Sequence, residues 1–149
     1  MNPYELIKGI NATGFVSHFF CQIDSSLNEK SDWEIGFYDK KSDNITTYVN
    51  GKIKNTDDVF KKLDDTVEKL ELNHVTVELE DAKKMFLENC PTLFPSEQLG
   101  DGFLILQTLH GKTHWNFTLI SKSLKFLNIK INTSTGEVDE HQIVELVQK

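Results

Sequence analysis

The chain has 149 residues, of which 38% are apolar and 26% charged, the composition of a globular protein of one domain or of two interdependent half-size units. Its net charge is −7 and all 16 basic residues are lysine, so we expect no nucleic-acid partner, since such interfaces use a basic stripe and arginine contacts. No segment approaches the ~20 apolar residues of a membrane span and the start lacks a secretory signal, so we expect a cytoplasmic protein without a membrane partner.

The first third of the chain predicts a helix followed by an antiparallel meander. Apolar residues at near-helical spacing indicate a short helix over 3–10. Alternation of apolar and polar residues then predicts strands with one solvated face over 15–23, 33–38 and 45–53. A polar stretch over 40–44 forms the turn between the last two strands.

The segment 56–71 has the pattern of an amphipathic helix. Asn55 or Thr56 can cap its first turn, and Asp57 and Asp58 suit the positive end of the helix dipole. Its apolar stripe consists of Val59, Leu63, Val67 and Leu70.

The second half repeats the helix and meander. Residues 74–78 indicate a short strand or an extended linker into a helix over 79–89, which Cys90-Pro91 is expected to stop. Alternation predicts further strands over 103–109, 115–120 and 124–131. Thr135 and Gly136 form a structural turn, in which glycine supplies a positive φ and the side chains of Asn132, Thr133, Ser134 and Thr135 can bond the turn's own amides. The tail 138–147 is expected to start as a strand and finish as a helix.

The two halves share a weak internal similarity. The first strand of each meander opens with Gly-Phe, and the second opens with Trp33 or Trp115. We expect both tryptophans to point inward as core residues. The sequence therefore predicts an α+β fold of two helix-plus-three-stranded antiparallel meander units, a degenerate repeat over 1–72 and a second repeat over 73–149.

Three stretches of the second half carry a family resemblance. They are the helix opening V-E-L-E-D-A-K-K at 77–84, the Trp115 strand, and I-K-I-N-T-S-T-G-E-V at 129–138. Over about residues 77–140 the chain resembles the PepSY domain, known from propeptides of thermolysin-like metallopeptidases. The resemblance implies a helix laid across a curved, cystatin-like sheet, a binding or inhibitory role and no catalytic residues. The family motif has Asp where this chain has Asn132.

No stretch predicts catalytic, cofactor-binding or metal-binding residues. Gly111-Lys112-Thr113 lacks the upstream glycine of a phosphate loop and joins two strands. His110 and His114 flank this turn and form at most half of a metal site. Cys90 lies at a helix end without the local signature of a cysteine hydrolase.

Tyr38 and Tyr48 are the candidate partner-binding residues, because both are expected on the outer face of neighbouring strands. We predict a non-enzymatic binding or regulatory module for a protein or peptide partner. One alternative is a small-molecule binder or enzyme with a pocket between the sheet and helix 56–71. Another is a homodimer in which exposed strand edges pair across a two-fold axis.

Overall fold

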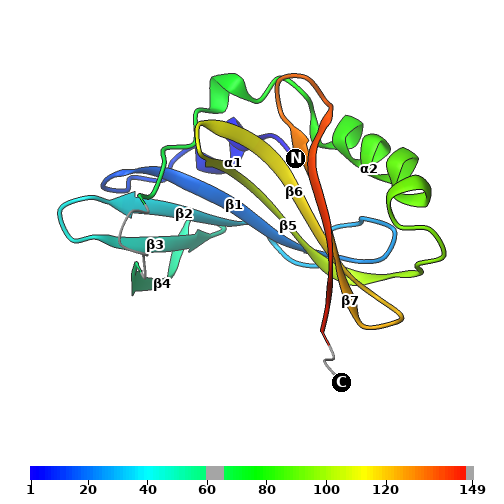
Figure 1. The fold of residues 1–149 in the computed structure, drawn as a ribbon. Helices are drawn as coiled ribbons and strands as arrows, with labels where there is room; N and C mark the ends of the chain where they lie inside the picture. The colour runs from blue at the N-terminus through cyan, green and yellow to red at the C-terminus, as the bar shows by residue number, and fades with distance from the viewer. Residues whose placement is uncertain (60–65, 147–149) are drawn as a thin grey trace.

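The computed structural model describes residues 1–59 and 66–146 (Figure 1). They form one eight-stranded antiparallel sheet with the strand order β4-β3-β2-β1-β5-β6-β7-β8. In chain order the elements are α1 (Pro3–Ile7), β1 (Phe15–Ile23), β2 (Glu34–Asp39), β3 (Asn44–Val49), β4 (Lys52–Asp58), the 3₁₀ helix η1 (Leu72–His74), α2 (Leu79–Leu93), β5 (Leu99–Leu109), β6 (Lys112–Ser121), β7 (Lys125–Asn132) and β8 (Val138–Glu145).

The prediction of two helix-plus-meander units is wrong. β1 and β5 pair at the centre of the sheet, with Phe19 opposite Leu106, so both meanders belong to one continuous sheet. Within the described residues α2 is the one long helix, and it packs on β6 and β7. The fold is therefore mostly β, with the long helix α2 covering part of one sheet face (Figure 1).

The predicted helix over 56–71 is wrong in the part that the structure describes. Asn50 and Gly51 have φ angles of 52° and 78° and make a two-residue turn between β3 and β4. Asn-Gly is a strong hairpin signal, because both residues accept a left-handed backbone. The chain therefore returns along β3, where Thr56 lies opposite Thr46. Residues 66–71 carry no helix, and 60–65, which include Leu63, lie outside the described residues.

The helix α2 binds the sheet through a stripe spaced by three and four residues. Its buried side chains are Leu79, Ala82, Phe86 and Cys90. The ring of Phe86 lies 5.1 Å, centroid to centroid, from that of Phe117 on β6. This spacing places one face of the helix on the core.

The predicted stop of this helix at Cys90-Pro91 is wrong. Pro91 lies inside α2, and Phe94 donates its backbone N–H to the carbonyl of Cys90 at 2.8 Å. Proline removes one backbone hydrogen bond, but near the end of a helix few bonds remain to be lost. Burial of the Phe94 side chain stabilises the last turn.

Trp33 and Trp115 occupy unlike positions, so no tandem repeat is shown. Both are buried, as predicted. Trp115 lies within β6 and donates its indole N–H to the Val77 carbonyl at 2.9 Å. Trp33 precedes β2, and its indole nitrogen has no hydrogen-bond partner among the described residues.

The tail is a strand through Glu145, and the predicted helical finish is not found as far as residue 146. β8 follows β7 in register, with Ile143 opposite Leu127. Among the described residues no helix is long and apolar enough to cross a membrane.

Candidate binding cavity

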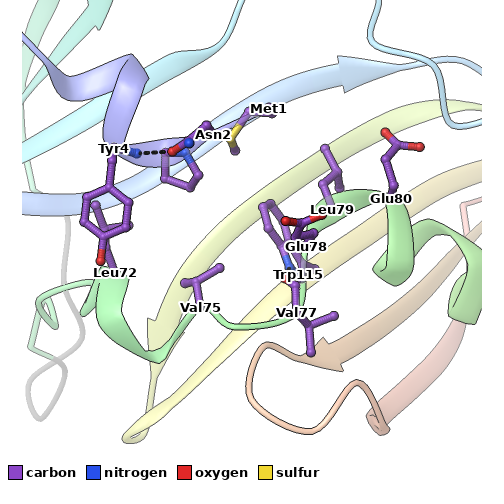
Figure 2. A pocket seen from close by; sticks show the side chains of 11 residues that line it. Met1, Asn2, Tyr4, Leu72, Val75, Val77, Glu78, Leu79, Glu80 and Trp115 are labelled. Atoms are coloured by element: carbon purple, nitrogen blue, oxygen red, sulfur yellow. Dashed lines mark hydrogen bonds between the residues drawn. The ribbon is translucent and has the colours of Figure 1, made fainter.

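A cavity of about 370 Å³ opens between the N-terminal segment, the linker before α2, and β6 (Figure 2). Its volume lies within the ~300–1,000 Å³ range of ligand pockets. The small-molecule binder or enzyme considered from the sequence has its pocket between the sheet and helix 56–71. This cavity lies against the linker before α2 instead. It is lined by residues 1–4, Leu72, Val75, residues 77–80 and Trp115.

The linker wall of the cavity is fixed to the sheet by backbone hydrogen bonds. The carbonyl of Val77 accepts the Trp115 indole N–H. The backbone N–H of Val77 donates to the Thr133 carbonyl at 2.8 Å. Thr133 is fully buried, and its hydroxyl oxygen lies 3.1 and 3.2 Å from the carbonyl oxygens of His74 and Thr113, which share its one proton. Because each buried polar group has a partner, this wall is held in one position.

The turn over 132–137 supports the same wall, and its predicted structure is confirmed. Gly136 has a φ of 78°, and the side-chain oxygen of Asn132 accepts the N–H groups of Ser134 and Thr135 at 2.8 and 3.2 Å. A side chain in place of Gly136 would begin 3.7 Å from a methyl of Val77. The turn at Gly136 therefore lies directly behind the cavity wall.

The opposite wall is the start of the chain. Asn2 caps α1, accepting the Tyr4 N–H at 3.0 Å, and Pro3 occupies the first turn. The Tyr4 ring is more than half exposed beside Leu72 (Figure 2).

The rim of the cavity is acidic. Glu78 and Glu80 are exposed at the start of α2 (Figure 2), and no lysine or histidine is found among the described lining residues. Glu78 makes no side-chain capping bond to the helix, and Glu80 lies 3.3 Å from Lys83. The cavity therefore combines an apolar interior with carboxylates at its mouth, which suits an apolar group attached to a cation.

Tyr38 and Tyr48 are not brought together. Tyr38 lies opposite Ile45 and Tyr48 opposite Ile35, so the two side chains project from opposite faces of the sheet. Tyr38 is buried and donates its hydroxyl to Asp43, whereas Tyr48 packs edge-on against Phe37. The shared aromatic patch expected from the sequence is not formed.

The two histidines of the β5–β6 turn have separate environments. The backbone N–H groups of His110 and Gly111 donate to the carboxylate of Glu68, so the chain's own anion occupies this turn. His114 is buried, and its Nε2 lies 2.7 Å from Asp139 Oδ2. Across the described residues, no three His, Cys, Asp or Glu side chains are grouped to hold a metal ion.

The Asp139 carboxylate predicts an acid-dependent loss of stability. Burial raises its pKa, but hydrogen bonds from Asn132 and His114 outweigh this and leave the pKa below its usual value. A lowered pKa contributes stability above the unfolded value of about 3.9, and this stability is lost as the pH falls through the folded value. We expect the free energy of unfolding, measured by urea titration, to decrease less steeply with falling pH below about pH 4 in Asp139→Asn than in the unmodified protein. An unchanged slope would contradict this role.

No family model matches this chain, and no curated protein does. Among solved structures it is similar to a putative lipoprotein from Clostridium difficile, with a TM-score of 0.51 and 13% sequence identity. The likeness covers 86% of this chain and 82% of that one. At this identity it shows the fold alone, and the PepSY resemblance stays a prediction.

Proposed function

We propose that this protein is a non-enzymatic binding module for a protein or peptide partner. The partner inserts an apolar side chain into the cavity and places a basic residue beside Glu78 or Glu80. The observation that carries the proposal is the pairing of an apolar cavity with an acidic rim. The proposal keeps the cytoplasmic location expected from the sequence.

At protein interfaces, apolar and charged residues usually contribute to binding in different ways. A buried apolar anchor supplies most of the binding energy, and charges around it select the partner and its orientation. Val75, Val77 and Leu79 contribute apolar surface to the cavity, and Trp115 fixes the linker behind it. The net charge of −7 further favours a basic partner at long range.

Binding can be measured through the fluorescence of Trp115 in a Trp33→Phe protein, because the chain has two tryptophans and Trp115 lines the cavity. The probe is the synthetic peptide Gly-Lys-Phe-Lys-Gly, which we expect to give a saturable change. Gly-Lys-Ser-Lys-Gly, without the apolar anchor, and Gly-Glu-Phe-Glu-Gly, with reversed charge, should bind at least about tenfold more weakly. Equal binding of the three peptides would overturn the proposal.

A cavity-filling variant tests the location of the site. Val75→Phe should weaken binding of Gly-Lys-Phe-Lys-Gly by about tenfold or more, because the added ring occupies the anchor's place. The matched control is Ile53→Phe, at a position on β4 that is 64% exposed and does not line the cavity. Undiminished binding to Val75→Phe would also overturn the proposal.

The volume of the cavity favours one second candidate function, the binding of a small organic cation. Phenethylamine carries the same phenyl ring and positive charge without a peptide backbone. If it binds the Trp33→Phe protein as tightly as the peptide does, the small-molecule function replaces the peptide proposal. Binding at least about tenfold weaker than that of the peptide supports the peptide function.

A further inference from the structure

The strand β8 is an open edge of the sheet. It pairs with β7 on one side and with no other described strand on the other (Figure 1, red). Seven of its eight residues are exposed, and Ile143 and Val144 are 45% and 48% exposed. Such an edge presents unpaired backbone donors and acceptors beside apolar side chains, which favours pairing with another strand.

The other edge, β4, is less suited to pairing. It carries Lys52 and Lys54 on either side of Ile53, its one apolar residue. Edge lysines discourage strand addition. The tail from residue 133 to 146 contains no lysine.

The register between β7 and β8 determines which backbone groups of β8 face the open side. Leu146 donates its N–H to the Leu124 carbonyl at 3.0 Å, and the ladder continues with Val144 opposite Phe126 and Gln142 opposite Asn128. Hydrogen-bonded pairs alternate in an antiparallel ladder, so the even-numbered residues bond to β7. The N–H and carbonyl groups of His141, Ile143 and Glu145 therefore point outward.

These outward groups are self-complementary about Ile143. We infer that β8 pairs antiparallel with β8 of a second copy of this chain, across a two-fold axis that passes beside Ile143. Each Ile143 then lies opposite the other, and each His141 lies opposite Glu145 of the other copy. All three residues present outward backbone groups, so the pairing supplies about six backbone hydrogen bonds, two for each bonded pair.

Charge disfavours one of the neighbouring registers. A shift that brings His141 opposite Ile143 also places Asp139 opposite Glu145, and like charges facing each other across a ladder are destabilising. A shift by one residue would place the outward backbone N–H and carbonyl groups of one copy opposite residues of the other copy whose backbone groups are already bonded to β7. In the proposed register Glu140 lies opposite Leu146. Asp139 stays outside the contact, where its carboxylate lies 2.7 Å from His114 and 2.9 Å from Asn132.

The oligomeric state tests the inference independently of the cavity. Sedimentation velocity over a range of concentrations should show a monomer–dimer equilibrium. Ile143→Lys sets two lysines against each other at the axis and should raise the dissociation constant by about tenfold or more. The control Ile53→Lys, at an exposed apolar position on the other edge, should leave the constant unchanged. Circular dichroism checks that each variant is folded.

A charge exchange tests the register itself. His141→Glu faces Glu145 of the other copy and should weaken the dimer, and adding Glu145→His should restore it, because the pair is then only reversed. A protein that stays monomeric at every concentration overturns the inference. A dimer that Ile143→Lys does not weaken, or that the double exchange does not restore, overturns it as well.

Discussion

Replacing Phe86 by alanine should lower the free energy of unfolding by about 3–5 kcal/mol. The Phe86 side chain is fully buried, and its ring lies 5.1 Å from that of Phe117 in the sheet. The loss combines the transfer of the ring out of water with a cavity that neighbouring strands cannot close. The effect is large because α2 is the one long helix covering this face in the described part of the chain, and its attachment depends on a single stripe of side chains.

The matched control is the next residue along the same helix. Leu87 is 47% exposed, so Leu87→Ala removes apolar atoms from the same helix without leaving a buried void. We expect a change of less than about 1 kcal/mol in urea unfolding followed by circular dichroism. Equal losses in the two variants would contradict the packing of α2 described above.

Replacing Gly102 by alanine should cost on the order of 3 kcal/mol and reduce soluble yield. A side chain added at Gly102 would begin 1.9 Å from the carbonyl oxygen of Thr118 on β6. The carbonyl oxygen belongs to the backbone and the added Cβ is bonded directly to the backbone, so no change of side-chain rotamer can relieve the clash. β5 would have to move away from β6 near the centre of the sheet, breaking ladder hydrogen bonds.

Gly9→Ala separates this clash from backbone strain. Gly9 has a φ of 82°, but no atom lies within 4 Å of an added side chain. Only the cost of a left-handed backbone remains there, about 1 kcal/mol. Thermal unfolding of both variants gives the comparison, and a Gly102→Ala protein as stable as Gly9→Ala would contradict the close approach of β5 and β6.

The cavity shows why the candidate site could be predicted only in part. The turn at Thr135-Gly136 and the internal bonds of Asn132 follow from local geometry, and the structure confirms them. The contact of Trp115 with the Val77 carbonyl joins residues far apart in the chain. Most buried indole N–H groups have a hydrogen-bond partner, which was the one available signal, but the sequence does not say which carbonyl supplies it.

The first half shows where periodicity misleads. Leu70 belongs to the apolar stripe read as a helix, yet it reaches the core from a non-helical segment and donates its N–H to the carbonyl of Val16. The Asn50-Gly51 hairpin signal lay just before that stripe and decided the path of the chain. A turn that allows immediate strand pairing outweighs the weak preference of the following residues for a helix.

The sequence by itself determined the positions of most strands, the start of α2 and the turn at Gly136. These features depend on alternation, spacing and backbone conformation, which neighbouring residues fix among themselves. Only the tertiary structure decided that β1 and β5 join both meanders in one sheet, that Tyr38 and Tyr48 face opposite sides, and that a cavity opens beside Trp115. Those outcomes depend on contacts between segments distant in the chain, whose pairing is selected by burial of the whole core rather than by any local pattern.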